Sequence, residues 1–219
     1  MITISTGTSV SIAKTYGPSV AMTALTNSAD SVTPAVATLA AGHSVVVGDY
    51  IEITSGWDLL NNRIARVSNV STNNITLEGV ITFGTAKYPA GTGTGSIRRI
   101  TAWSQLSQLK DMSASGGDQQ FVDITTISDR TTKQMPTVRS AVTTNITVFD
   151  DPTLSWYADV TVASDSSTPY GLLMVFPNNS RLVANAYWGL QKVPGVAKND
   201  ALTSQISLSY AADPIRYSN

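Results

Sequence analysis

His43 is the only histidine among the 219 residues, and the chain contains no cysteine. Zinc and iron–sulfur centres need cysteine or several histidines as ligands, so the composition excludes both kinds of site. A nucleophilic triad would need His43 beside an activated serine, yet no Gly-x-Ser-x-Gly motif occurs. His43 lies just before a predicted strand, and we interpret it as a turn residue.

Asp150 and Asp151 are adjacent carboxylates, the residue type that glycosidases use in pairs. Those enzymes need two carboxyl groups that face each other across a bond at about 5–9.5 Å, whereas neighbours in sequence do not face each other. Asp151 also precedes Pro152, which suits the first position of a helix because no N–H is needed there. We therefore predict that Asp151 caps a helix and that Pro152 begins it.

Two other patterns resemble ligand sites only superficially. The stretch Gly91-Thr-Gly-Thr-Gly95 is rich in glycine, but a dinucleotide site needs a strand before such a loop and a helix after it. Here a strand is predicted to follow, so we interpret the stretch as a linker. The tryptophans are spread over four predicted elements, which favours core or interface positions over a sugar-stacking face; they are Trp57, Trp103, Trp156 and Trp188.

Charge and hydropathy narrow the function classes further. Hydrophobic residues make up 42% of the chain and charged residues 13%, with a formal net charge of −1. Tight electrostatic binding of nucleic acid requires many Lys and Arg contacts to phosphates, which this composition does not supply. The longest apolar run, 172–176, is far shorter than the ~20 residues of a membrane span, and the N-terminus lacks a signal-peptide pattern. We expect a non-enzymatic protein made in the cytoplasm, with no metal, cofactor or membrane contact.

The elements that must position any site are mostly strands, because apolar and polar residues alternate with a period of two. In 137–148, for example, Val138, Val142, Ile146 and Val148 are predicted to share a buried face. The pair 171–176 and 181–190 is predicted to form a hairpin, because the residues between them have turn composition. The strands predicted outside residues 26–80 are 97–109, 137–148, 171–176, 181–190 and 201–210.

One helix is predicted after Asp151, about twelve residues long. Its apolar stripe is predicted to pack on a sheet and consists of Leu154, Tyr157, Ala158, Thr161 and Val162.

Residues 26–80 have a different pattern, with short strands separated by turns rich in Gly, Asn and Asp. Strand spacing of this kind is typical of a small barrel or meander. We predict a small β-barrel-like module at 26–80, inserted into a larger β domain. Its strands are predicted near 35–39, 50–54, 63–67 and 74–78.

The stretch 111–136 is polar and contains glycine, yet it also carries the strand-like residues Phe121, Ile124 and Ile127. Long connections inside compact domains are usually functional or disordered. Two interpretations stay open: a floppy loop, or an extended hairpin arm that pairs with a neighbouring subunit.

A resemblance rests on phrases that occur in order along the chain, including Ile100-Thr-Ala-Trp103, Gln134-Met-Pro136 and Asp150-Asp-Pro-Thr-Leu154. The other phrases are 3–12, 111–120 and 207–217. Together they resemble the major tail tube proteins of long, non-contractile-tailed bacteriophages. Residues 41–54 are similar to a small β-barrel module inserted in some of these proteins.

The resemblance implies a β-sandwich with one flanking α-helix, formed by 1–25 and 81–219, around the module at 26–80. It further implies hexameric rings that stack into a hollow tail tube of the virion. This tube would enclose the tape measure protein and conduct double-stranded DNA during ejection. The implied partners are further copies of the chain, the tape measure protein, the tail terminator and the tail-tip proteins.

Two residue sets are expected to serve this role. The arm 111–136 would contact other rings or subunits through Ser113, Gly116, Gly117, Asp118, Gln119, Gln120, Asp129, Arg130, Lys133 and Gln134. The lumen would be lined by polar residues that let DNA slide without specific binding, because each phosphate contact adds affinity. These are Thr143, Asn145, Thr147, Thr203, Gln205 and Ser207, with Arg139 as a lone cation.

Two alternatives remain from the sequence. The chain could be a β-sandwich host-attachment or carbohydrate-binding protein that stacks sugars on Trp57 or Trp188. It could also be another virion component, such as a tail terminator or a capsid decoration protein.

Overall fold

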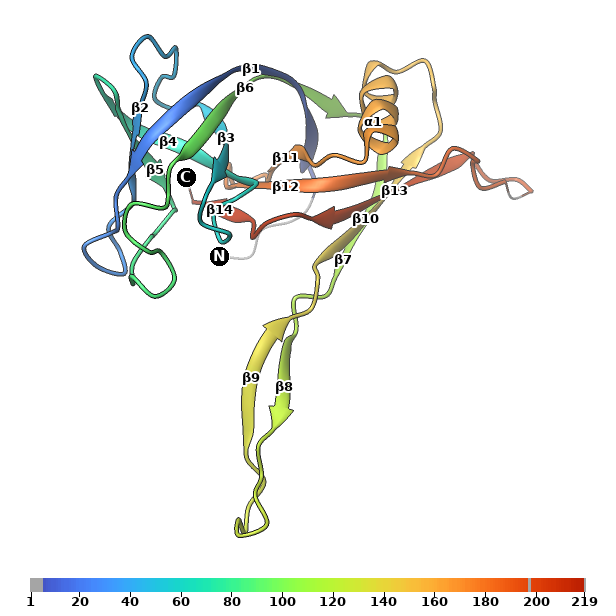
Figure 1. Ribbon diagram of the computed structural model, residues 1–219. Coiled ribbons are helices and arrows are strands. Elements are labelled where there is room, and N and C mark those ends of the chain that lie inside the picture. Colours follow the sequence, from blue (N-terminus) through green and yellow to red (C-terminus); the bar gives the residue numbers. More distant parts are fainter. Residues whose placement is uncertain (1–5, 197, 219) are drawn as a thin grey trace.

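The computed structural model describes residues 6–196 and 198–218 (Figure 1). Residues 1–5 of the predicted 1–25 segment, 197 and 219 lie outside the described residues. The described chain is mainly β with one helix, α1 (Ser155–Ser166), which confirms the predicted fold class. The described strands are β1 (Ser9–Leu25), β2 (Val36–Leu39), β3 (Tyr50–Ser55), β4 (Arg63–Ser71), β5 (Asn74–Glu78), β6 (Gly95–Leu106), β7 (Leu109–Ser115), β8 (Gln119–Asp123), β9 (Gln134–Arg139), β10 (Thr143–Phe149), β11 (Tyr170–Val175), β12 (Arg181–Leu190), β13 (Thr203–Tyr210) and β14 (Ile215–Tyr217).

The main sheet has the strand order β2-β5-β4-β3-β6-β1-β11-β12-β13-β10-β7, with β14 beside β12. An additional pairing of β1 with β2 joins the first strands into a closed circuit, β1-β2-β5-β4-β3-β6. We call these strands the six-strand circuit. The remaining pair, β8 and β9, forms a separate two-stranded sheet that projects from the body in Figure 1.

Two hydrophobic cores hold this arrangement together. The six-strand circuit contributes Ile51, Leu77 and Ile97 to the first core, which also takes Val183 of β12 and Ile215 of β14. Residues on both sides of the predicted 26–80 boundary therefore share one core, and the division into domains stays a prediction.

The second core lies where α1 packs on the sheet, chiefly on β12. Its members include Trp156 of α1, Ile146 of β10, Ile206 of β13 and Trp188 of β12. The helix therefore packs mainly on β12 and also contacts β6 and β1, while β10 and β13 contribute to the same core.

Several predicted strands are confirmed. The four short strands in 26–80 correspond to β2, β3, β4 and β5, and the hairpin around 177–180 corresponds to β11 and β12. The long strand predicted at 97–109 ends earlier, at Leu106, because Gln108 has a φ of 61° in the left-handed region.

The single strand predicted at 137–148 is wrong, because the chain leaves the sheet at 140–142 and forms β9 and β10 instead. Val138, predicted to be buried, is 72% exposed, whereas Ile146 and Val148 are fully buried. The break is held by paired hydrogen bonds in which the Ser140 amide donates to the Asp118 carbonyl and the Asp118 amide donates to Ser140 Oγ.

The predicted helix cap is also wrong. The helix begins at Ser155, and Leu154 occupies the capping position without a side-chain hydrogen bond. Asp151 instead accepts hydrogen bonds from the Thr153 amide and hydroxyl, which closes a local turn before the helix. Pro152 lies in that turn rather than at the first helical position.

The buried stripe of α1 is correspondingly different from the prediction. It consists of Trp156, Val160 and Ala163. Of the predicted stripe, Leu154 and Tyr157 are partly buried against the second core, whereas Val162 is 59% exposed. A helix that starts three residues later than Pro152 presents other side chains to the sheet.

Candidate functional site

The side chains that the sequence offered as catalytic candidates, His43, Asp150 and Asp151, make local structural contacts. His43 Nε2 lies 3.0 Å from the Thr72 carbonyl oxygen, a contact that ties the 41–44 turn to the end of β4. Asp150 accepts a hydrogen bond from the Ser204 hydroxyl at 2.7 Å. The two hydrogen bonds from Thr153 lower the pKa of Asp151, because they favour its charged form. The two adjacent carboxylates therefore serve different local contacts.

Metal and membrane sites receive no support from the described part of the chain. Its residues contain no group of three or more His, Asp or Glu side chains that could hold a metal ion. No helix in the described ranges is long and apolar enough to cross a membrane.

The glycine-rich stretch 91–95 packs on Trp57 and is followed by a strand, β6, as predicted. Trp57 Nε1 donates to the Pro89 carbonyl and to Thr92 Oγ1, each at 2.9 Å. A Cβ on Gly93 would lie 2.8 Å from the Trp57 ring, so only glycine fits there without a shift. This stretch closes one end of the first core.

The tryptophans are unsuited to sugar stacking. Trp57, Trp156 and Trp188 are between 1% and 4% exposed, and Trp103 is half-buried against the first core. The core positions predicted for them are confirmed for these three, and the stacking platform proposed at Trp57 or Trp188 is wrong.

An open polar face of the sheet is the first candidate functional surface. Asn145 of β10 lies opposite Ser207 of β13, and Thr147 lies opposite Gln205. Directly paired residues share a face of an antiparallel sheet. The register therefore brings together six residues predicted to line the lumen: Thr143, Asn145, Thr147, Thr203, Gln205 and Ser207. Their intervening neighbours, such as Ile146 and Ile206, point into the second core.

Arg139, the seventh predicted residue, lies apart from this face. It ends β9 in the separate two-stranded sheet, opposite Gln119. Its predicted position assumed that β9 and β10 were one strand, and the break at 140–142 removes that alternation.

Strand β7 extends the polar face and was missed by the sequence reasoning. Ser113 lies opposite Asn145, Asp111 opposite Thr147 and Ser115 opposite Thr143. The alternation of Asp111, Ser113 and Ser115 with Met112 and Ala114 was the available signal. Asp111 supplies the one charge in these three rows.

Strand β7 is also an edge. Within the described residues it pairs with β10 on one side, and its other side has no strand partner. An edge strand presents a row of backbone N–H and C=O groups to another chain. The polar face therefore ends at a free edge.

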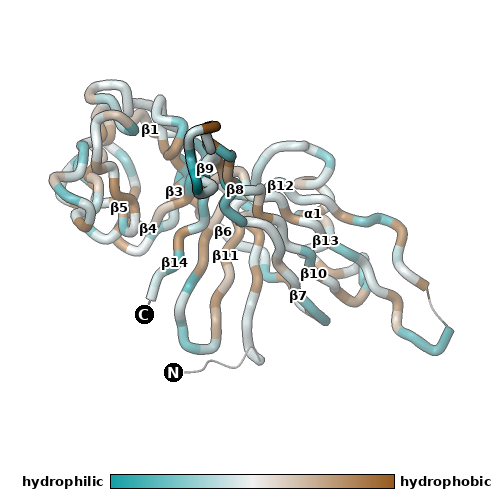
Figure 2. The backbone as a smooth tube through the Cα atoms, turned by 90° about the horizontal axis from the view of Figure 1, so that it is seen from below, coloured by the Kyte–Doolittle hydropathy of each residue, from teal (hydrophilic) through white to brown (hydrophobic). Residues whose placement is uncertain are grey.

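The projecting hairpin β8–β9 is the second candidate surface (Figure 1). The predicted arm began at 111, but 111–115 belong to β7 of the main sheet, so from here on we call residues 116–139 the arm. In Figure 2 the molecule is seen from below, so that the arm points toward the viewer and a hydrophobic segment is visible at its end. The exposed apolar residues include Phe121, Val122, Ile127 and Met135. Of the two interpretations left open by the sequence, the structure contains the extended hairpin.

The predicted arm residues occupy several kinds of position. Ser113 lies before the arm on β7, and Gly116 and Gly117 form the turn into it with φ of 86° and 84°. Residues at the base are held by local hydrogen bonds; Gln119 Nε2, for instance, donates to the Thr137 carbonyl at 3.1 Å. Asp118 also lies at the base, hydrogen-bonded to Ser140, and the others lie along the hairpin or at its tip: Gln120, Asp129, Arg130, Lys133 and Gln134.

The tip of the arm is built by carboxylates. Asp123 Oδ1 accepts from the Thr125 amide at 2.8 Å, and Asp129 Oδ2 accepts from the Thr126 amide at 2.9 Å. Lys133 forms an ion pair with Asp129. These hydrogen bonds lower the pKa of both carboxyl groups, with the Thr125 hydroxyl acting most on Asp123 and Lys133 most on Asp129.

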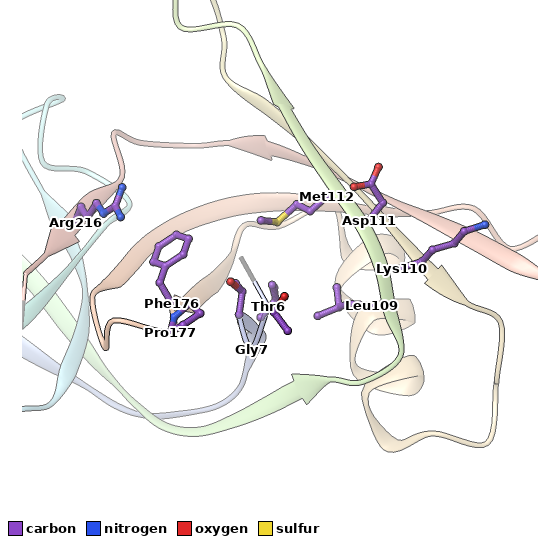
Figure 3. Close-up of a pocket in the computed structure, with 11 residues that line it drawn as sticks. Thr6, Gly7, Leu109, Lys110, Asp111, Met112, Phe176, Pro177 and Arg216 are labelled. Carbon is purple, nitrogen blue, oxygen red and sulfur yellow. The ribbon is translucent and has the colours of Figure 1, made fainter. Parts of the chain in front are cut away.

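A groove of about 640 Å³ lies beside β7, between this edge and the turn that joins β11 to β12 (Figure 3). Leu109, Met112 and Phe176 give it an apolar lining, and Asp111 and Arg216 add charge. Leu109 and Met112 lie opposite Val148 and Ile146 of the second core, so the groove opens on the core side of β7 and the polar residues lie on the other face of this strand.

Comparison with known proteins matches most of the chain to one protein family. The family model described as phage tail tube protein, TTP, matches residues 55–219. A search of the curated proteins finds no match to the chain. Among solved structures, the chain is similar to a chain in "Cryo-EM structure of the anti-feeding prophage cap (AFP tube terminating cap)", with 17% identity over 52% of this chain and 83% of that chain and a TM-score of 0.37. The range matched by the family model includes the arm, the polar face and α1.

Proposed function

We propose, from the premise that this chain belongs to the phage tail tube protein family, that its copies form hexameric rings which stack into the hollow tail tube of the virion. In this proposal the tube encloses the tape measure protein and conducts double-stranded DNA during ejection. The role is structural and non-enzymatic, and no cofactor takes part.

The observation that carries the proposal is the polar face, poor in charge, that ends at a free edge. Its rows across β7, β10 and β13 contain hydroxyl and amide side chains and the carboxylate of Asp111. At one end of the same face lies Phe149, opposite Thr203, with the Lys110 ammonium over its ring. A wall of this kind stays hydrated and offers few ion pairs to phosphates, so DNA passes along it without being held tightly. We therefore place this face toward the lumen.

The free edge of β7 supports ring closure. If each copy pairs its β7 edge with a different surface of its neighbour, β7 is no longer open to stray pairing. A head-to-tail interface of this kind generates a ring when the rotation between copies closes. The arm then contacts the next ring, and the tail terminator and tail-tip proteins contact the two ends of the stack.

The module at 26–80 belongs on the outside in this arrangement. A lumen wide enough for DNA leaves no room for six such modules, and this segment lies in the half of the molecule away from the polar face (Figure 2). Its exposed residues, such as Ser31, then face solvent.

Electron microscopy of the concentrated protein is the first experiment. Hollow tubes of stacked rings support the proposal. Closed rings that never stack would instead indicate a terminator, and a discrete trimer under all conditions would indicate a host-attachment protein.

Cysteine labelling then tests the orientation, because the natural chain has no cysteine. We expect Asn145→Cys in assembled tubes to react with a small maleimide and to resist a maleimide carrying a bulky polymer. The matched control Ser31→Cys should react with both. Equal reaction of the two variants with the bulky reagent would place Asn145 outside the lumen and overturn the assignment of this face.

A further inference from the structure

A buried carboxylate lies where the six-strand circuit meets the rest of the sheet. Glu52 of β3 is 5% exposed, although burying a carboxylate is costly unless its charge is paired and its oxygens accept hydrogen bonds. Its Oε2 accepts from Arg98 Nε of β6 at 2.9 Å, and its Oε1 accepts from Asn185 Nδ2 of β12 at 2.8 Å. Both partners are therefore used to satisfy one buried group.

The two hydrogen bonds of Glu52 differ in what they connect. We call β11, β12, β13 and β10, whose side chains share the second core with α1, the helix-covered part of the sheet. Glu52 and Arg98 lie opposite each other on neighbouring strands of the circuit, so their ion pair stays within it. Asn185 is fully buried and belongs to the helix-covered part. Its hydrogen bond to Glu52 therefore joins the two halves of the molecule.

A second polar contact crosses between the same two strands. Tyr50 precedes Glu52 by two positions, so both side chains lie on one face of β3. Arg181 Nη1 of β12 donates to the Tyr50 hydroxyl at 3.2 Å. By the same alternation Arg181 and Asn185 share one face of β12, whereas Ala186 lies on the opposite face and belongs to the second core. Strand β12 thus has the circuit on one face and the second core on the other.

The network also spans the irregular stretch of the long strands β1 and β6. Their pairing shifts between Tyr16 and Ser19, and a shift of this kind bends the strand. Arg98 lies opposite Ser19, and its guanidinium lies 4.6 Å from the centre of the Tyr16 ring. The Tyr16 hydroxyl accepts a hydrogen bond from the Gly171 amide of β11 at 2.9 Å. Contacts from Glu52 through Arg98 and Tyr16 therefore cross the bend and end on the helix-covered part.

From this geometry we propose that Glu52, Arg98, Tyr16 and Asn185 form a pin that sets one angle between the circuit and the helix-covered part of the sheet. Apolar contacts are not directional, so the shared first core by itself accepts a range of slightly rotated packings. A buried polar group without its partner costs free energy. Only an arrangement that brings both Arg98 and Asn185 to the carboxylate satisfies it, and the pin selects that arrangement.

The pin is a property of the free subunit and does not depend on tube formation. Strands β2 to β5 lie within 26–80, so the angle that the pin sets also decides the direction in which this segment points. Every copy then carries the segment in the same direction before any copy meets another.

A change of the pin to apolar residues separates its orienting role from stability. Replacement of a buried ion pair by apolar side chains of similar volume is often neutral or stabilising. The pin variant is Glu52→Met/Arg98→Met/Asn185→Leu. We expect it to melt cooperatively while the angle between the two halves becomes variable.

Distances between two spin labels measure that angle, because the natural chain has no cysteine to interfere. One label is placed by Asn69→Cys at an exposed position of β4, and the other by Val162→Cys on α1, where the side chain is 59% exposed. Double electron–electron resonance of free subunits then gives the distribution of distances. We expect a single narrow distribution with the natural pin and one at least about twofold wider in the pin variant, because apolar contacts do not select one packing.

An ion pair within one half provides the matched control. Lys192 Nζ lies 2.7 Å from Asp165 Oδ1 of α1, and both residues lie outside the circuit. Asp165→Asn/Lys192→Met should leave the distribution unchanged. A pin variant that melts cooperatively with a distribution as narrow as that of the control would overturn the proposal.

A single substitution decides the outcome if the pin variant does not fold. Asn185→Leu keeps the ion pair between Glu52 and Arg98 and removes only the hydrogen bond between the two halves. We expect a folded subunit whose distribution is wider or shifted in mean distance. An unchanged distribution in Asn185→Leu would overturn the pin. Loss of cooperative folding in both variants would show that the network maintains the core itself, and would overturn the proposal as well.

Discussion

The six-strand circuit and the arm are both made of antiparallel strands, yet they are stabilised in opposite ways. The circuit closes on itself and buries Ile51, Ile53 and Leu77 completely. The arm exposes Phe121 and Val122 and is shaped by hydrogen bonds at its two ends. The comparison teaches that strand-forming residues alone do not produce a core. Closure supplies one for the circuit, and a partner must supply one for the arm.

The largest expected difference in stability is between deletion of the module and deletion of the arm. Deletion of 26–80 should abolish cooperative folding, because it uncovers Met22, Ile97 and Val183 of the shared first core. Replacement of 119–138 by a short glycine turn should leave a folded subunit, because the arm contributes no residue to either core. Circular dichroism and thermal melting of both variants check this difference. A cooperative melt of the first variant would show that 26–80 folds apart from the rest.

Single truncations should show the same contrast at smaller scale. Ile53→Ala should lower the free energy of unfolding by about 2–5 kcal/mol, because it leaves a cavity in a packed core. Val122→Ala should change that free energy by no more than about 0.5 kcal/mol in the free subunit. Denaturant titration measures both values. Comparable losses from the two substitutions would contradict the view that the arm lacks a core of its own.

The turn into the arm should be sensitive to one methyl group. A Cβ on Gly116 would overlap the Ala141 carbonyl, and the φ of 86° is itself unfavourable for alanine. Gly91 has a φ of 78° but open space around it. Gly91→Ala should therefore lower the free energy of unfolding by only the about 1–2 kcal/mol that a left-handed backbone costs a residue with a Cβ.

Gly116→Ala should therefore loosen the arm more than Gly91→Ala affects its own loop. Limited proteolysis within 117–139 measures this, with Gly91→Ala as the control for unaltered arm cleavage. Unchanged cleavage of the arm in Gly116→Ala would show that its base does not depend on this turn.

The smallest expected effect is a pH dependence confined to the arm tip. The pKa values of Asp123 and Asp129 are lowered by the hydrogen bonds they accept. Their contribution is therefore fully present above the ordinary carboxyl pKa of about 3.9 and is lost as the pH falls through the lowered values. Amide hydrogen exchange of Thr125 and Thr126 should speed up relative to the core on acidification. Asp123→Asn should remove this dependence at Thr125, and a dependence that persisted would contradict the assignment.

The sequence predicted the circuit's strands well because alternation and turn residues are local signals. Strands β4 and β5 are joined by the two polar residues Thr72 and Asn73, and the connection 56–62 between β3 and β4 contains glycine, aspartate and two asparagines. The break at 140–142 was hidden, because Val138 continues the alternation of Ile146 although one lies on the arm and the other in a core. The alternation of apolar and polar residues indicates that one face of a strand will be covered, but it does not indicate whether the same chain or another molecule covers it.

The site was predicted in part for a related reason. The residues of β10 and β13 were identified as polar, but their meeting depends on a register between segments some sixty positions apart, such as Asn145 with Ser207. The edge position of β7 likewise follows from topology rather than from its own residues. The helix start was missed because Asp151 and Pro152 form a turn that uses the same residue types as a cap.

The long strands β1 and β6 have a mechanical consequence. They pair along the molecule from Val10 with Leu106 to Met22 with Gly95. The six-strand circuit and the helix-covered part of the sheet are therefore connected through the same two strands. A force that pulls these two halves apart along the strands loads many backbone hydrogen bonds at once, in shear, instead of opening them one after another. The irregular pairing between Ala13 and Ser19 sits midway and lets the pair bend without breaking. A subunit built in this way transmits tension from one half to the other without a hinge.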